Sequence, residues 1–321
     1  MRILAAQAIS TGLTSANAGR TLRAGLLASL LWLGGMFPAW GAIFEMQLYR
    51  GMCEASAAAF IDETHFAVAS DETNVLRLYT RPDDSVGTGL DLTGFTGFNK
   101  SDIEAAARIG DRVYWLSSHS LNSDGEDKPK RKVLFATRIA SRNGAMTLEP
   151  VGSPAASLRE PLLAAAGVSK TDLNIEGLAA TPEGELLIGL RDTLNGRAII
   201  VPFHNPAAVV DQKSAPQFGK PIELDLKGNG VRSLDRVADR YFIVAGPVSD
   251  AAGFALYSWS GPGTDPVPIE GVSFDDLHPE ALMGVPGSKA LQILSDDGSD
   301  DCQEDKTPEN KKAFRSIDVE P

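Results

Sequence analysis

A pattern that recurs five times limits the fold of this chain more than any other feature of its sequence. Each copy has a charged residue, a short apolar run, a turn, a second apolar run and a polar corner. The fullest copy runs from Asn174 to Asp192, as Asn-Ile-Glu-Gly-Leu-Ala-Ala-Thr-Pro-Glu-Gly-Glu-Leu-Leu-Ile-Gly-Leu-Arg-Asp. The charged residues that lead the five copies, which we call the anchor residues, are Glu54, Glu104, Glu176, Arg232 and Glu280.

The spacing of the copies indicates an all-β protein, a β-propeller. The anchor residues are 50, 72, 56 and 48 residues apart, and units of several short strands repeating every 40 to 50 residues or so are typical of propeller blades. The apolar runs are short and bounded by Gly, Asp, Asn and Pro, which favours strands over helices. Five copies predict five blades. Six remain open, because the residues from Ile43 to Pro321 would also divide into six blades of about 46 residues.

The remaining strands are predicted from apolar runs beside the repeat. In the other four copies the second run lies at 65–69, 113–116, 241–245 and 290–294. A third run follows most corners, as at 75–79, 133–137, 198–202 and 254–259. The 72-residue spacing holds an insertion at 155–167, in which Pro161 near the start and Gly167 at the end predict a short helix.

The first 42 residues have the composition of a secretory signal peptide. They contain Arg2, Arg20 and Arg23 but no acid, followed by an apolar run at 24–37 and a small-residue segment. We therefore expect a signal peptide at 1–42 and one propeller domain at 43–321, in a periplasmic or secreted protein. The alternative is an uncleaved membrane anchor, because residues 24–43 are just long enough to span a bilayer.

The ends of the chain are expected to meet. Residues 43–50 alternate like a strand but precede the first anchor residue, and the last copy lacks a strand beyond 313–319. An N-terminal strand that completes the last blade would close the ring and remove open sheet edges. Cys53 and Cys302 lie near this closure, and an exported protein allows a disulfide between them; two free thiols are the alternative.

The charge of the chain argues against nucleic acid as a partner. Loss of residues 1–42 changes the formal net charge from −12 to −15, whereas nucleic-acid affinity comes mainly from cationic contacts to phosphate. An acidic surface favours cations or cationic ligands. No later stretch is long and apolar enough to span a membrane, and we expect a monomer.

Chain direction predicts where a site would lie. If each anchor residue begins an innermost strand, the second strand runs back and returns its corner to the same face. Glu54, Glu104, Glu176 and Glu280 would then surround the channel mouth, with Arg232 among them. The corner residues expected around them are Asp71, Glu72, His119, Arg191, Asp192, Asp296 and Asp297.

Four converging carboxylates repel one another unless protons, arginine or a bound cation neutralise them. The four glutamates are therefore candidate ligands for a divalent metal, Ca²⁺ in preference to Mg²⁺, with Asp71, Asp192 and Asp296 on the same face. Arg191 and Arg232 are suited to bind a phosphate or carboxylate, and His119 is a candidate general acid or base. The alternative is structural: each acid would accept backbone hydrogen bonds from the next blade.

The chain resembles an uncharacterised bacterial family of domains of unknown function. The resemblance is carried by Asp102-Ile103-Glu104, Asn174-Ile175-Glu176-Gly177-Leu178-Ala179 and Pro279-Glu280-Ala281-Leu282. It covers nearly all of residues 49–298. That family has no assigned reaction, so the resemblance supports the propeller fold and adds little about chemistry.

A second resemblance is confined to one blade. Ile175-Glu176-Gly177-Leu178-Ala179 with Leu187-Ile188-Gly189-Leu190-Arg191-Asp192 is similar to a repeated unit of the esterase-like phytase propellers. Glutamates of related calcium-dependent propellers imply a metal at the axis of this chain too. The pattern departs at Arg232, where a base replaces the acid, so a one-to-one transfer of metal ligands is not justified.

Two functions follow. The first is an exported hydrolase that depends on a divalent metal and acts on a phosphoester, ester or lactone. The second is a non-catalytic propeller that binds a small-molecule or phosphorylated ligand, or a partner, through the same face. The absence of a nucleophile motif such as Gly-x-Ser-x-Gly favours the second function.

Overall fold

The computed structural model of the protein describes residues 46–249, 253–299 and 301–321. The signal peptide predicted for residues 1–42 lies outside the described residues, as does the start of the predicted strand at 43–50. Within the described residues, no helix is both long and apolar enough to cross a membrane.

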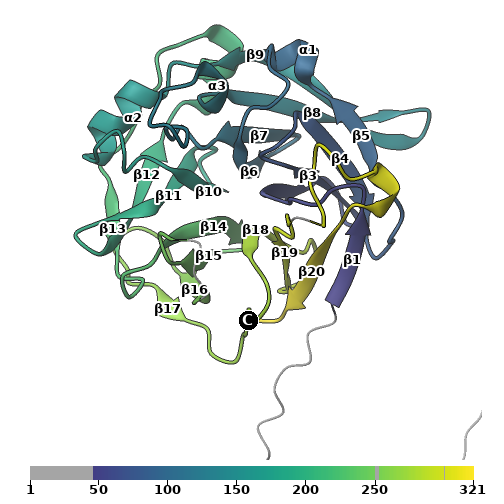
Figure 1. Ribbon diagram of the computed structural model, residues 1–321. Helices are drawn as coiled ribbons and strands as arrows, with labels where there is room; N and C mark the ends of the chain where they lie inside the picture. The colour runs from purple at the N-terminus through teal and green to yellow at the C-terminus, as the bar shows by residue number, and fades with distance from the viewer. Residues whose placement is uncertain (1–45, 250–252, 300) are drawn as a thin grey trace, which may run out of the picture. The chain divides into compact units, whose positions relative to one another are not determined.

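Five four-stranded antiparallel sheets surround one axis, so the predicted five-bladed β-propeller is confirmed (Figure 1). The first blade consists of β2 (Ala57–Phe60), β3 (His65–Ala69), β4 (Val75–Thr80) and β5 (Thr88–Asp91). The second consists of β6 (Ile103–Ile109), β7 (Arg112–Ser117), β8 (Leu134–Arg142) and β9 (Ala145–Ala155). The third consists of β10 (Ile175–Ala180), β11 (Leu186–Leu194), β12 (Arg197–Phe203) and β13 (Ile222–Leu224). The fourth consists of β14 (Gly230–Val237), β15 (Arg240–Gly246), β16 (Ala255–Trp259) and β17 (Val267–Pro268). The fifth consists of β18 (Pro279–Gly284), β19 (Leu291–Ser295), β20 (Ala313–Val319) and the N-terminal strand β1 (Met46–Arg50).

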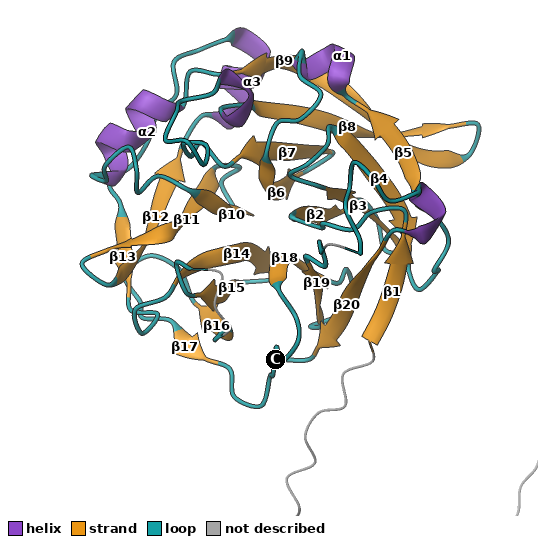
Figure 2. Cartoon of the chain, viewed as in Figure 1, coloured by secondary structure: helices purple, strands orange, loops and turns teal. Residues whose placement is uncertain are grey.

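The helices lie in the connections outside the sheets (Figure 2). They are α1 (Thr93–Thr96), α2 (Arg159–Ala166), α3 (Pro206–Gln212) and the 3-10 turns η1 (Pro129–Arg131) and η2 (Glu309–Lys311). The helix α2 is the one expected at 155–167, and it ends at Gly167 in a left-handed conformation with φ of 69°.

Apolar side chains pack between neighbouring blades and hold the ring together. Along β7, Trp115 packs in the cluster between the first two blades, whereas Tyr114 and Leu116 pack in the cluster between the second and third. Successive strand residues point to opposite faces of a sheet, and both faces of each blade are covered. This explains why the blade sequences are continuous apolar runs and do not alternate with polar residues.

Small residues let the inner strands approach closely. A Cβ atom on Gly177 or Gly189 would lie 2.6 Å from a methyl group of Val231 in the next blade. The inner strands β2, β6, β10, β14 and β18 each contact the next one around the axis, and β18 contacts β2. The ring of inner strands is therefore continuous.

The N-terminal strand closes the ring as predicted. β1 pairs antiparallel with β20, from Met46 opposite Ile317 to Arg50 opposite Ala313. The predicted Cys53–Cys302 disulfide is present. Beside it, the backbone N–H of Cys53 donates to the buried carboxylate of Glu304 at 2.8 Å, and Lys312 pairs with the same carboxylate at 3.0 Å.

Removal of the disulfide is expected to lower the free energy of unfolding by as much as about 4–5 kcal/mol, since the bridge closes a long loop. The test is urea unfolding of a Cys53→Ser/Cys302→Ser variant. The wild-type protein unfolded in the presence of a reductant serves as the control and should match the variant. An unchanged unfolding midpoint in both would show that strand pairing alone closes the ring.

Candidate functional site

Four of the five anchor residues lie in β-bulges at the starts of their inner strands. In the third blade Ile175 pairs with Leu190 and Gly177 pairs with Gly189, which leaves Glu176 as the extra residue. The same register shift leaves Glu104, Arg232 and Glu280 without a partner in their blades. A bulge takes one residue out of the regular pleat and changes the direction of its side chain.

The corners after the second strands return beside the anchor residues, as chain direction predicted. The residue two positions before an anchor accepts a hydrogen bond from the corner: Ser118 N–H donates to Asp102 O at 2.9 Å, Arg191 N–H to Asn174 O at 2.8 Å, and Asp296 N–H to His278 O at 2.8 Å. One face of the propeller therefore carries both sets of polar residues.

Arginine neutralises one half of this face. Arg232, only 3% exposed, lies between Glu176, whose Oε2 is 2.9 Å from its Nε, and Glu280, with which its Nη2 pairs. Arg191 Nη1 lies 2.9 Å from Glu176 Oε1. Burial raises the pKa of Glu176, whereas the two guanidinium groups lower it. The predicted site arginines are therefore already paired with the predicted site glutamates.

The other half is acidic. Asp71, Asp102 and Glu104 each place a carboxylate oxygen within 4.8 Å of the other two. Asp102 is paired with Arg131, whose Nη2 lies 2.7 Å from its Oδ2, and it accepts a hydrogen bond from Ser118. Burial raises the pKa of Glu104 well above its usual value, and the charges of Asp102 and Asp71 raise it further.

Glu54 has one carboxylate oxygen without a partner among the described residues. Its Oε2 is buried and makes no hydrogen bond with any residue that the structure describes. Burial, followed by the charges of Asp71 and Asp296, raises the pKa of Glu54 to about 8. A Cβ atom on Gly298 would lie 2.6 Å from Glu54 Cγ, so glycine is required where the last corner crosses this side chain.

Three neighbouring carboxyl groups behave in the same way. Burial raises the pKa of Asp71 to about 7 even though Lys100 opposes the shift. Burial and the charge of Glu176 raise the pKa of Glu280 to about 7. Burial and the charge of Glu280 raise the pKa of Asp296 to about 7. Because Lys100 and Arg232 offset these charges only in part, the carboxylates are a candidate set of hard oxygen ligands for a metal ion.

The remaining predicted residues lie apart from this acidic cluster. Asp192 is half-buried in β11, where burial and Asp172 raise its pKa. His119 is fully buried; its Nδ1 lies 2.9 Å from Ser117 O, and burial lowers its pKa to about 4. The ring has no exposed path to a ligand, so the structure gives no support to the acid–base role expected of His119.

Sequence reasoning missed three features of the face. Asp102 and His278 each precede an anchor residue by two positions. Asn174 holds the same position in the third blade, where its Nδ2 lies 3.4 Å from Glu176 Oε1. That shared position was the signal available in the sequence. Phe254, which packs 5.7 Å from the Arg232 guanidinium, had no such signal because it belongs to the outer part of its blade.

Comparison with known proteins supports the fold and assigns no reaction. A family model described as "Protein of unknown function (DUF3616)" matches residues 161–275, a narrower span than the 49–298 expected from the motifs. No curated protein matches the chain. The resemblance to the esterase-like phytase propellers stays a prediction.

Solved structures with the same general architecture are similar only in fold. A GH43 beta-1,3-galactosidase with galactodeoxynojirimycin has a TM-score of 0.51 at 11% identity, over 85% of this chain and 93% of that one. The PQQ-bound aldose sugar dehydrogenase of Streptomyces coelicolor has a TM-score of 0.46 at 10% identity, over 86% and 98% of the two chains. Identities this low give no information about the reaction.

Loss of Arg232 should destabilise the protein strongly, because it leaves two buried glutamates without their shared cation. We expect Arg232→Met to lower the free energy of unfolding by about 3–5 kcal/mol at pH 7.5, with a smaller loss at pH 5, where the glutamates can take up protons. The control is Arg197→Met, which removes an exposed pair with Glu223 and should cost at most about 1 kcal/mol. Equal effects in urea unfolding would contradict this assignment.

The raised carboxyl pKa values predict that stability falls as pH rises. Between about pH 5 and 8, folded Glu54, Asp71, Glu280 and Asp296 hold protons that the unfolded chain has already released. The free energy of unfolding should therefore decrease through this range in metal-free buffer. Urea unfolding at a series of pH values measures it. Glu54→Gln should flatten the decrease between pH 7 and 8, and an unchanged slope would contradict the assignment.

Proposed function

We propose that this protein is an exported β-propeller that binds a divalent cation at the acidic half of the axial face. The ligands proposed are Asp71, Asp102 and Glu104, with Glu54 beside them and with Glu280 and Asp296 next around the axis. The observation that carries the proposal is the convergence of three carboxylate oxygens within 4.8 Å beside an anchor acid whose buried oxygen has no partner among the described residues. A divalent cation would offset both the burial and the mutual repulsion that raise these pKa values.

Ca²⁺ suits this set better than Mg²⁺. Calcium accepts six to eight oxygen ligands in irregular geometry, whereas magnesium requires a near-ideal octahedron and keeps several waters. The proposed ligands come from a corner, a strand start and a bulge in two blades, an arrangement without octahedral regularity. The number of nearby carboxylates also exceeds the one or two that usually hold magnesium.

The activity proposed for this site is hydrolysis of an ester, lactone or phosphoester. A bound divalent ion can polarise a carbonyl or phosphoryl oxygen or activate a water. In this chain the acids would hold the ion, while Arg232 stays fixed between Glu176 and Glu280 in the other half of the face. The raised pKa of Glu54 would allow its carboxyl group to hold or release a proton near neutral pH.

Ligand binding without catalysis is the second candidate, and a specific observation favours it. Arg191 and Arg232 are committed to ion pairs, and His119 is buried. The charges of both arginines are therefore balanced within the protein, and the imidazole expected to act in catalysis is enclosed. A hydrolase panel of esters, lactones and phosphoesters separates the two candidates, since only the first predicts turnover that a chelator abolishes.

Export and a monomeric state belong to the same proposal. The Cys53–Cys302 disulfide is of the kind that persists in oxidising compartments such as the periplasm or the medium. The acidic net charge suits a small-molecule or cationic ligand better than nucleic acid. Fractionation of the expressing cells and sedimentation of the purified protein test these two points.

Calcium should raise the melting temperature of metal-free protein, because an ion that binds only the folded state stabilises it by mass action. The test is thermal unfolding with EDTA, with Ca²⁺ and with Mg²⁺, together with elemental analysis of the protein as purified. Glu104→Gln should abolish most of the calcium-dependent increase. The matched control is Glu63→Gln in the exposed β2–β3 turn, which should keep it.

No increase with either ion would contradict cation binding. An equal increase in wild type and Glu104→Gln would place the ion elsewhere. If the protein hydrolyses a panel substrate and EDTA does not stop the reaction, metal dependence is contradicted but hydrolase activity is not.

A further inference from the structure

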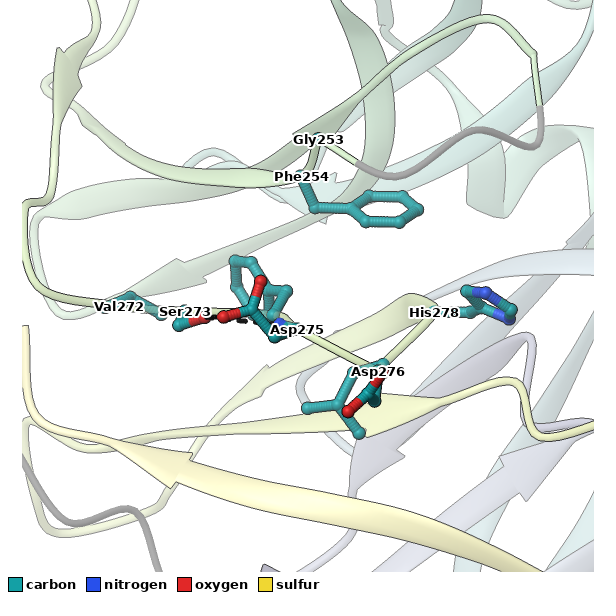
Figure 3. Close-up of a pocket in the computed structure, with 9 residues that line it drawn as sticks. Gly253, Phe254, Val272, Ser273, Asp275, Asp276 and His278 are labelled. Carbon is teal, nitrogen blue, oxygen red and sulfur yellow. Dashed lines mark hydrogen bonds between the residues drawn. The ribbon is translucent and has the colours of Figure 1, made fainter.

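A cleft of about 460 Å³ opens between the fourth and fifth blades. It is bounded by residues 253–254 on one side and residues 272–278 on the other. Figure 3 shows the ring of Phe254 and the imidazole of His278 beside this space, with Asp275 and Asp276 on the facing segment. The volume is that of a small-molecule site.

The cleft continues into the axial face. Phe254 and His278 also line a smaller cavity of about 120 Å³, whose other lining residues are Arg232, Glu280 and Asp296. A ligand in the cleft would therefore reach the arginine and acids of the axial face. His278 is exposed, in contrast to the buried His119, and is the imidazole that such a ligand would meet.

The charge of the lining selects the charge of the ligand. Four acids line the two cavities: the cleft has Asp275 and Asp276, and the smaller cavity has Glu280 and Asp296. The lining arginine, Arg232, is already paired with two glutamates. Because a cleft lined mainly by one charge concentrates ligands of the opposite charge, this one attracts cations and repels phosphate esters.

The aromatic wall supports the same choice. Gly246 lets Phe254 lie against Arg232, because a Cβ atom at Gly246 would come within 2.6 Å of the Phe254 ring and 2.8 Å of the Arg232 side chain. The ring is thereby held in place at the edge of the cleft. An aromatic face binds the apolar body of a ligand and also attracts an ammonium group.

The inner end of the cleft offers a hydrogen-bond donor. Arg232 Nη1 is buried and donates to no acceptor among the residues that the structure describes. A buried donor without a partner is destabilising, and an acceptor in the small cavity would satisfy it. Since two carboxylates already balance the arginine, a neutral hydroxyl or carbonyl oxygen fits better than a second anion.

We propose that the cleft bounded by Phe254 and Asp275–His278 binds a small organic cation that also carries a neutral oxygen acceptor, such as an amino alcohol or its ester. The ammonium group meets Asp275 and Asp276, the apolar body lies on Phe254, and the oxygen accepts from Arg232. Binding of the organic cation does not depend on the proposed function. If the protein is the proposed hydrolase, the cleft favours a cationic ester over a phosphoester as its substrate.

Three probes with the same body and different charge test the choice of ligand. Benzylamine, benzyl alcohol and benzoate are titrated into the full mature protein in a calorimeter. We expect benzylamine to bind about tenfold more tightly than benzyl alcohol, and benzoate not to bind. The oxygen acceptor is tested with 2-phenylglycinol, which adds a hydroxymethyl group to benzylamine and should bind several-fold more tightly still.

Asp275→Asn/Asp276→Asn should weaken benzylamine binding about tenfold. Asn suits position 276 because Asp276 has a left-handed backbone with φ of 61°, which Asn tolerates. The matched control is Asp111→Asn in the exposed β6–β7 turn, which should leave binding unchanged. The double variant should retain the calcium-dependent increase in melting temperature, so that loss of this site is distinguished from loss of the cation site.

Binding of benzoate as tightly as benzylamine, or binding of none of the probes, would overturn the proposal. So would equal weakening by Asp111→Asn, which would show a general effect of surface charge. Equal affinity for 2-phenylglycinol and benzylamine would overturn the role of Arg232 as a donor to the ligand. A failure of calcium to bind would leave the amine results unaffected and would count only against the proposed function.

Discussion

The bridge that Arg232 makes between Glu176 and Glu280 is the interaction on which the rest of the axial face depends. Five inner strands around one axis bring their leading side chains together, and four of these side chains are glutamates. One guanidinium in the fourth blade balances the acids of the third and fifth blades. Since a single arginine cannot reach every blade, the acids of the first two blades stay in excess. The face therefore has one half in which arginine balances the acids and one half in which acids predominate.

The bulges explain how a packed blade can present charge at its centre. In a regular strand the residue beside an inward apolar side chain would point into the neighbouring interface, where a carboxylate without a partner is costly. The extra residue of a bulge leaves that alternation. The strand beyond it resumes apolar packing, as Leu178 and Ala179 do in separate interblade clusters. In four blades, the single extra residue of the bulge thus carries the charge, and the rest of the inner strand packs in the apolar interfaces.

The strands could be predicted because their physics is local. The run at 65–69 became β3 and the run at 313–319 became β20 with the predicted bounds. β13 and β17 were missed because they are outer strands of three and two residues, and Val267 is 58% exposed. Such strands carry no apolar pattern that distinguishes them from loops. Their place is set by pairing with the strand before them.

The face that carries the anchor residues could be predicted from the sequence, but the ion pairs on it could not. The spacing of the repeat placed Glu104, Glu176 and Glu280 on one face, which the register and the corners confirm. Sequence spacing does not say which acid an arginine will pair with, because side-chain direction and burial decide it. The same limit explains why His119 was chosen over His278 as the candidate acid or base. His119 follows a strand and His278 precedes one, and only packing distinguishes the buried ring from the exposed one.

Ring closure has a consequence for how the molecule is made. β1 is synthesised before every other strand, and its partner β20 is synthesised after all the intervening blades. During synthesis the fifth blade is therefore incomplete and β1 has nowhere to pair, so its backbone groups must be kept from other chains until β20 emerges. Contacts between such distant segments form slowly. The fifth blade is therefore the last of the five that can be completed, and its outer edge stays open until the final strand is released.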